Sequence, residues 1–258
     1  MSIRAVLTLA ITIEADEDAL RVAADLAARF DAQMAVLVLS VWPGSEFADV
    51  QRPLSEVLAD LAGTDSSTQK DRAKIKEWLE RHAPDCEIRD IPVESAVARD
   101  LAVAHARMSD LIVMCRSQSH ARARRELIED VLFKSGRPVL LLPHLPKVPN
   151  WDRILIAWNA KAQAVRAVAA ALPMLRAAQQ VRIVTVDALP SLIGHGEAPG
   201  RELAAYLARH DVSVEVSNVD GLGRAHSEAI SEAALDFNAD LIVMGAYGHS
   251  RERVYAWR

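Results

Sequence analysis

The chain has 258 residues, of which 51% are hydrophobic, and it carries a net charge of −5. This mildly acidic balance excludes general binding to nucleic acid, which needs a basic surface. Its apolar runs are far shorter than the roughly 20 residues that span a membrane, and the N-terminus lacks the pattern of a signal peptide. We therefore expect a cytoplasmic protein that binds neither nucleic acid nor membranes.

Apolar, β-branched runs alternate with segments of helical periodicity through the first half of the chain. The first run, residues 5–13, predicts a strand, and Asp16 is the expected cap of a helix over residues 17–30. The same alternation continues from there. It predicts strands at 34–41, 86–93, 111–115 and 138–142, and helices at 65–82, broken from the preceding helical stretch near Gly63, and at 95–108 and 122–134.

A proline-rich segment, residues 144–150, predicts a semi-stiff linker between two domains, residues 1–143 and 151–258. The pattern restarts after it. Strands are expected at 154–158, 181–186, 212–219 and 241–244, and helices at 162–176, 201–210 and 227–237. Strands that alternate with helices over short connections predict two doubly wound parallel-sheet α/β domains of the Rossmann-like kind.

An internal repeat supports the division into two domains. The sequence DLIVM at residues 110–114 returns at residues 240–244, about 130 residues later. Cys86 and Cys115 are the only cysteines, and they predict buried thiols rather than a disulfide framework. The chain is therefore expected to contain two copies of one structural unit.

A glycine turn follows the second DLIVM run. Gly245 and Gly248 allow close approach of the backbone to a ligand, and His249 and Ser250 begin the next helix. Because backbone N–H groups at a helix N-terminus attract negative charge, the turn predicts an anion site. The alternative is a bare strand-to-helix turn in which Ser250 only caps the helix.

The corresponding turn of the first half differs. Cys115 and Gln118 replace the two glycines, so we expect this half to have a degenerate ligand motif. A basic cluster follows, and we interpret it as a solvated helix face in preference to an anion site. Its members are Arg116, Arg122, Arg124 and Arg125.

The glycine turn and the alternating architecture resemble the universal stress protein family in its tandem, two-domain form. The resemblance implies a strand order of 3-2-1-4-5 and ATP bound across strands one and four. The phosphates would then rest on Gly245, Gly248, His249 and Ser250. Family members also place an Asp after the first strand, facing the adenine or ribose; the nearest positions are Asn159 in the second half and Glu14 or Asp16 in the first. Val186 and Asp187 would lie beside the base.

The resemblance is incomplete at the end of the chain. The family's later Gly-Ser/Thr phosphate clip would begin near Arg258, so we expect the second domain to lack that clip, its last helix and its fifth strand. The strand at 241–244 would then present an open edge. We expect either residues 138–142 or a second chain, as in a homodimer, to cover it.

These features favour a stress-response binding or regulatory module over an enzyme. No nucleophile with a partner base, no phosphate-binding loop with its lysine and no metal-ligand spacing is recognisable. The expected ligand is an adenine nucleotide such as ATP, or another small anion, with no cofactor required. The alternative is a dimerising scaffold whose pockets are both degenerate.

Overall fold

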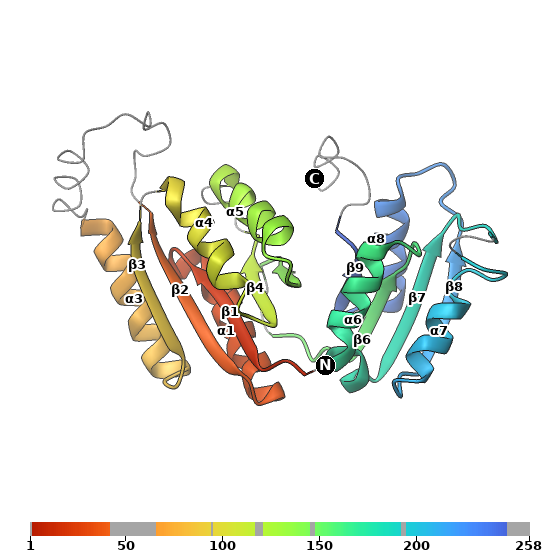
Figure 1. The fold of residues 1–258 in the computed structure, drawn as a ribbon, viewed down its shortest axis with the longest axis horizontal. Helices are drawn as coiled ribbons and strands as arrows, with labels where there is room; N and C mark the ends of the chain where they lie inside the picture. Colours follow the sequence, from red (N-terminus) through yellow and green to blue (C-terminus); the bar gives the residue numbers. More distant parts are fainter. Residues whose placement is uncertain are drawn as a thin grey trace. The chain divides into compact units, whose positions relative to one another are not determined.

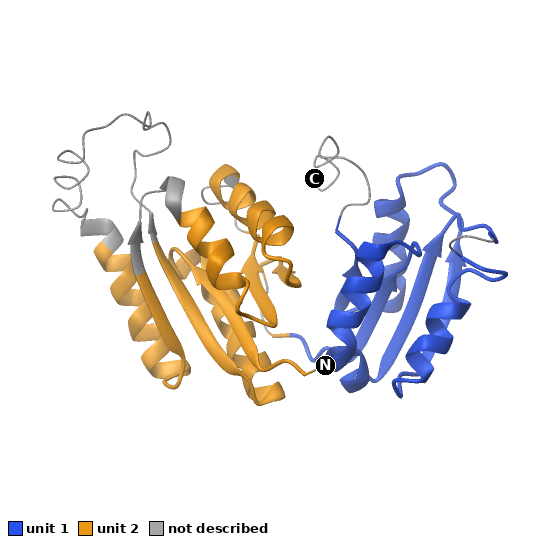
Figure 2. Ribbon diagram, viewed as in Figure 1, with its two compact units in different colours: residues 1, 149–258 blue, residues 2–148 orange. Residues whose placement is uncertain are grey.

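The computed structural model describes residues 2–41, 66–93, 95–116, 121–144, 148–191 and 195–246. The chain divides into an N-terminal unit, residues 2–148, and a C-terminal unit, residues 149–258, shown in orange and blue in Figure 2. The expected helix break near Gly63 and the turn residues Gly248, His249 and Ser250 lie outside the described residues.

The N-terminal unit contains a five-stranded parallel sheet in the order β3-β2-β1-β4-β5. Helices α4 and α5 pack together on one face of the sheet, and α1 and α3 pack together on the other (Figure 1). This arrangement confirms the predicted doubly wound fold and strand order. The elements are β1 (Ala5–Ala10), α1 (Ile13–Phe30), β2 (Gln33–Val41), α3 (Ser66–His82), β3 (Glu87–Val93), α4 (Ser95–Ala106), β4 (Leu111–Cys115), α5 (Ala121–Lys134) and β5 (Val139–Leu142).

The C-terminal unit repeats this topology with a four-stranded parallel sheet in the order β8-β7-β6-β9. Its elements are β6 (Arg153–Ala157), α6 (Ala162–Ala177), β7 (Gln180–Val186), α7 (Arg201–Ala208), β8 (Val214–Val219), α8 (His226–Phe237) and β9 (Leu241–Met244). Within the described part of this unit, β9 pairs with β6 alone. Strand β5 pairs with β4 and is the edge strand of the N-terminal sheet, so the covering of β9 by residues 138–142 or by a second chain stays a prediction.

Helix α1 begins earlier than its sequence pattern predicts. The apolar run continues past Ala10, but β1 ends there and the helix starts at Ile13. Thr12 is the N-cap, because its hydroxyl accepts a hydrogen bond from the backbone N–H of Ala15 at 3.3 Å. The prediction that Asp16 caps this helix is therefore wrong, and Asp16 is free for another role.

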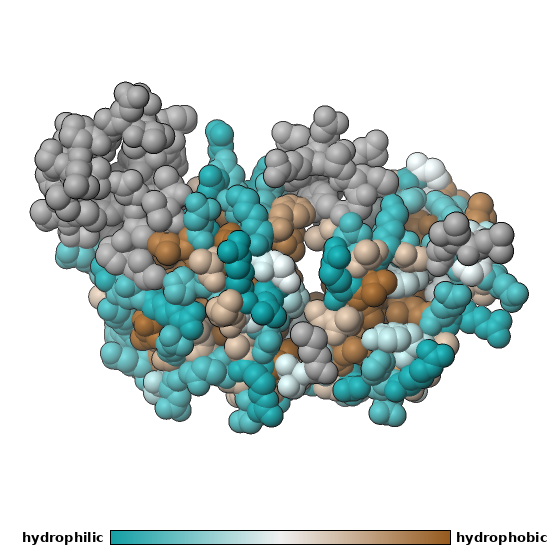
Figure 3. Space-filling model, viewed as in Figure 1, coloured by the Kyte–Doolittle hydropathy of each residue, from teal (hydrophilic) through white to brown (hydrophobic). Residues whose placement is uncertain are grey.

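Each unit has its own apolar core between the sheet and its helices. In the N-terminal unit, Leu7 and Ile112 of the sheet belong to one buried cluster with Ala102 and Val131 of the helices above them. Figure 3 shows hydrophilic residues over much of the visible surface, with smaller hydrophobic groups between them. Among the described residues, none of the helices has the length and apolar character needed to cross a bilayer.

The repeated Asp of the two DLIVM runs has the same role in both units. The Asp110 carboxylate accepts hydrogen bonds from the backbone N–H groups of Arg4 at 2.8 Å and Ala5 at 3.1 Å. In the C-terminal unit, the Asp240 carboxylate accepts from Asp152 at 2.9 Å and Arg153 at 3.0 Å. Each carboxylate thus satisfies N–H groups where the first strand of its sheet begins, and it fixes that strand beside its neighbour.

Replacing the Asp110 carboxylate should lower the stability of the N-terminal unit, and the loss should be larger when no acceptor oxygen remains. We expect Asp110→Ala to reduce the free energy of unfolding by about 1–2 kcal/mol, because two backbone donors lose a charged acceptor. Asp110→Asn keeps an acceptor oxygen and should lose less. Urea unfolding followed by circular dichroism measures both, with Asp25→Ala, an exposed carboxylate on α1, as the control. A midpoint for Asp110→Ala equal to that of Asp25→Ala would contradict the assignment.

Candidate functional site

The topology of each sheet creates one crevice suited to a ligand. In the N-terminal unit, the connections that leave β1 and β4 run to opposite faces of the sheet, because α1 packs on one face and α5 on the other. In doubly wound folds, ligands bind beyond the carboxyl ends of the strands at such a switch point. The equivalent place in the C-terminal unit lies beyond β6 and β9. These two places are the candidate sites.

In the N-terminal unit an ion pair fills the switch point. Asp16, on the first turns of α1, is fully buried, and Arg124 of α5 is 5% exposed. The guanidinium donates to the two carboxylate oxygens at 2.5 and 3.1 Å. One of these oxygens also accepts from the backbone N–H groups of Ile11 at 2.8 Å and Thr12 at 3.2 Å. Helices from both faces of the sheet are thereby joined over the ends of the strands.

This ion pair corrects the interpretation of the basic cluster. Arg122 is exposed and pairs with Glu126 of the next helical turn, as a solvated helix face predicts. Arg124 instead points inward, and its role was missed because its acidic partner lies far away in the sequence. Glu14, the other acidic residue considered for the base or ribose, is exposed and pairs with Lys74 at 2.7 Å.

Two of the predicted site residues, Asn159 and Gly245, lie at the switch point of the C-terminal unit. Asn159 follows β6, is exposed, and its side-chain oxygen accepts from the backbone N–H of Lys161 at 3.2 Å. Gly245 follows β9 and lies against the first turn of α6. A Cβ atom at Gly245 would be 2.6 Å from the backbone nitrogen of Ala164 and 2.8 Å from the carbonyl carbon of Gln163. Glycine is therefore needed here for close packing, with or without a ligand.

The other two described candidates lie at the end of β7, the strand beside β6. Val186 is its last residue, and Asp187 follows in a left-handed conformation with φ 49°. The Asp187 carboxylate accepts from the backbone N–H of Gly221 at 2.8 Å, and its second oxygen is 3.7 Å from Nε2 of His226. Asp187 thus holds the loop after β8, and its side chain remains partly exposed at the same edge of the sheet.

A polar network that sequence patterns did not reveal shapes this edge. The side-chain oxygen of Asn218 accepts from the Thr185 hydroxyl at 2.8 Å, and its side-chain nitrogen donates to the carbonyl of Ala188 at 3.0 Å. The backbone N–H of Ala188 completes the network. The only sequence signal is a polar residue within a strand of alternating pattern. The network fixes the turn that carries Asp187.

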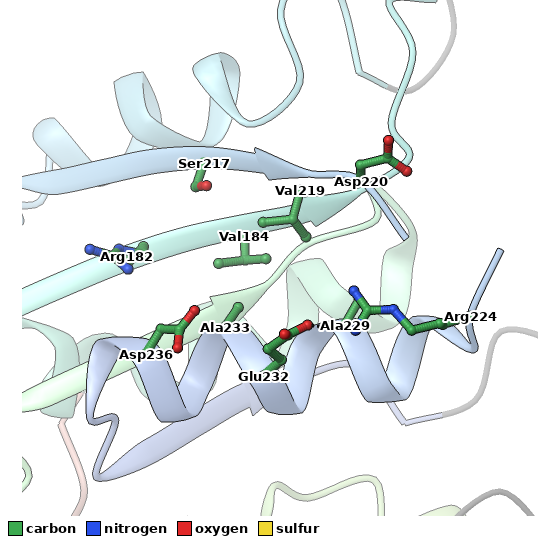
Figure 4. A pocket seen from close by; sticks show the side chains of 10 residues that line it. All are labelled: Arg182, Val184, Ser217, Val219, Asp220, Arg224, Ala229, Glu232, Ala233 and Asp236. Carbon is green, nitrogen blue, oxygen red and sulfur yellow. Dashed lines mark hydrogen bonds and ion pairs between the residues drawn. The ribbon is translucent and has the colours of Figure 1, made fainter. Parts of the chain in front are cut away.

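A cavity in the C-terminal unit is lined by other residues than these candidates. It has a volume of about 170 Å³ and lies between α8 and strands β7 and β8 (Figure 4). Glu232 is paired with Arg224 at its rim, at 2.7 Å, and Asp236 also lines it. Among the described residues, there is no group of three or more His, Cys, Asp or Glu side chains able to hold a metal ion.

The arrangement defines a class of protein: two doubly wound α/β units in one chain, each with a switch point between its first and fourth strands. Many solved structures match this chain, and two of them illustrate the shared architecture. A universal stress protein from Archaeoglobus fulgidus DSM 4304 aligns with a TM-score of 0.69 at 17% identity, over 95% of this chain and 86% of its own. A Pseudomonas aeruginosa UCBPP-PA14 protein, provisionally named a universal stress protein, gives 0.54 at 13% identity, over 97% and 85%.

No family model matches the sequence, and no curated protein matches it. The likeness to solved structures nevertheless establishes the architecture, because it extends over nearly the whole chain. The particular fold is that of the universal stress proteins, as the glycine turn and the alternating pattern predict.

Because Gly245 packs closely against α6, a side chain at this position should destabilise the C-terminal unit. We expect Gly245→Ala to lower the free energy of unfolding of the C-terminal unit by about 1–3 kcal/mol, because the added Cβ would displace the first turn of α6. Gly223→Ala is the control: its φ is +73°, but nothing lies within 4 Å of the added atom. Urea unfolding compares the two. A smaller loss for Gly245→Ala than for Gly223→Ala would contradict this packing.

The two thiols should react very differently. Burial, reinforced by Asp16 and Asp18, raises the pKa of Cys115 to about 12, so the thiol stays protonated at all moderate pH values. Burial also raises the pKa of Cys86, but this residue is half-exposed. With a disulfide reagent at pH 8, we expect one thiol to react in the folded protein and the second after denaturation. Cys86→Ser should abolish the first phase; two reactive thiols in the folded chain would refute the assignment.

Proposed function

We propose that the chain acts as a universal stress protein, a regulatory module that binds an adenine nucleotide in its C-terminal unit and performs no catalysis. The shared fold and the position of Gly245 and Asn159 at the switch point support this proposal. ATP is the first candidate ligand. Its phosphates would lie against the turn at Gly245 and the N-terminus of α6, with the base or ribose toward Asn159, Val186 and Asp187.

The observation that carries the proposal is the charge at the first turn of α6. Helix α1 has a Thr cap and two acidic residues, Glu14 and Asp16, in its first turn. Helix α6 has no acidic residue in its first turn, and Lys161 at its N-cap makes no side-chain cap hydrogen bond. The first turn of α6 therefore carries no carboxylate of its own to neutralise the partial positive charge of the helix, so a negatively charged ligand would be stabilised there.

The proposal is tested by adding one negative charge to this turn. Gln163→Glu changes a partly buried first-turn residue of α6 with little change in shape, and an acid there favours the helix itself. We expect it to weaken ATP binding about five- to tenfold, measured by isothermal titration calorimetry with Mg²⁺. Gln180→Glu makes the same chemical change at the amino end of β7, at the opposite edge of the sheet, and should leave the affinity unchanged.

Two results would reject nucleotide binding. One is no measurable heat with ATP for the unaltered protein; the other is equal affinity of Gln163→Glu and Gln180→Glu. Either result would favour the second candidate function, a homodimeric scaffold. The edge of β9 supports that candidate, because β9 pairs with β6 alone within the described residues of its unit, and Ile242 is 37% exposed. Light scattering that shows a monomer at high concentration would reject the scaffold.

A further inference from the structure

The switch point of the N-terminal unit holds a complete anion site whose occupant is part of the chain. We propose that the Asp16 carboxylate is a built-in ligand, held by the backbone N–H groups of Ile11 and Thr12 and by the guanidinium of Arg124. This unit is thereby closed to external anions. The inference concerns the N-terminal unit alone and does not rest on nucleotide binding by the C-terminal unit.

The donors converge on one carboxylate from two parts of the unit. Two N–H groups come from the turn between β1 and α1, at 2.8 and 3.2 Å, and the guanidinium reaches it from α5 at 2.5 and 3.1 Å. All the charge is buried, with Asp16 at 0% and Arg124 at 5% exposure. A site of this kind matches a small carboxylate, because two parallel N–H donors of a guanidinium fit its two oxygens.

The guanidinium is not fully satisfied by Asp16. Its Nε is buried and has no hydrogen-bond partner among the described residues. A buried Arg needs a negative partner, since an unpaired charge in the interior is strongly destabilising. Loss of the Asp16 carboxylate would therefore leave a cation and two backbone donors around an empty volume, and an anion of matching size should enter it.

The C-terminal unit lacks this internal occupant at the matching helix position. Asp16 is the fourth residue after the N-cap Thr12 of α1, and Val165 is the fourth after the N-cap Lys161 of α6. Val165 is 51% exposed. The two units thus differ at this position: one supplies a buried negative charge to the turn after its first strand, and the other has an exposed apolar side chain.

The test is rescue of Asp16→Ala by formate, which is the carboxyl group that this substitution removes. The full chain is prepared in a buffer free of carboxylates and phosphate, and its thermal unfolding is measured with sodium formate or sodium chloride at equal ionic strength. With formate at roughly ten times its dissociation constant, we expect the melting temperature of Asp16→Ala to rise about 3–6 °C above its value in chloride. The unaltered protein should show no such difference.

Two control variants locate the effect. Asp25→Ala removes an exposed carboxylate from the same helix and should show no response to formate. Asp16→Ala combined with Arg124→Met removes the cation as well, and it should also lose the response. If Asp16→Ala does not fold in chloride, formate should restore its circular dichroism spectrum. Failure of formate to raise the melting temperature or to restore the fold, or an equal response in the double variant, overturns the inference.

Discussion

The structure depends on how a parallel sheet ends. Within each sheet all strands are parallel, so backbone N–H groups and helix N-termini gather beyond its carboxyl edge, most openly where the connections run to opposite faces. These backbone donors need a negatively charged partner beyond the edge of the sheet, or they must be hydrated. The N-terminal unit meets this demand with Asp16 and Arg124. In the C-terminal unit, the described residues at the same place include the backbone of Gly245 and the exposed Asn159.

At the amino ends of the sheets, backbone N–H groups also need a negatively charged acceptor, which explains the repeated DLIVM sequence. Asp110 and Asp240 each accept two backbone hydrogen bonds where the first strand of their sheet begins. The apolar residues that follow form β4 and β9, each beside the first strand. The repeated residues therefore serve the architecture and not a ligand. At the opposite edge of the sheets the two units differ, because Asp16 of α1 corresponds to Val165 of α6.

Much of the fold could be predicted because local pattern and tertiary environment agree. Buried parallel strands such as β4 and β9 are short apolar runs, and both were predicted with their observed limits. The start of α1 was not, because Ile11 and Ile13 continue the β-branched run of β1 while Thr12 already caps the helix. Cap geometry decides that boundary, and residue type alone does not express it.

The site was harder to predict, because its chemistry depends on residues that are distant in sequence. Asp16 and Arg124 are 108 positions apart, and nothing near either residue marks it as buried. Gly245 was correctly singled out as a position where backbone must come close, but its neighbour in the structure is α6. A glycine signals close approach without saying what approaches, so the pattern could not separate a packing contact from a ligand contact.

The Asp16–Arg124 pair also has a mechanical consequence. It ties together helices that lie on opposite faces of one sheet, so neither can detach without stranding a charge in the interior. Partial opening of the N-terminal unit is thereby penalised, which favours joint unfolding of its two helical layers. The Asp16 side chain, proposed above as the internal ligand of this unit, thus also links the two helical layers of the domain.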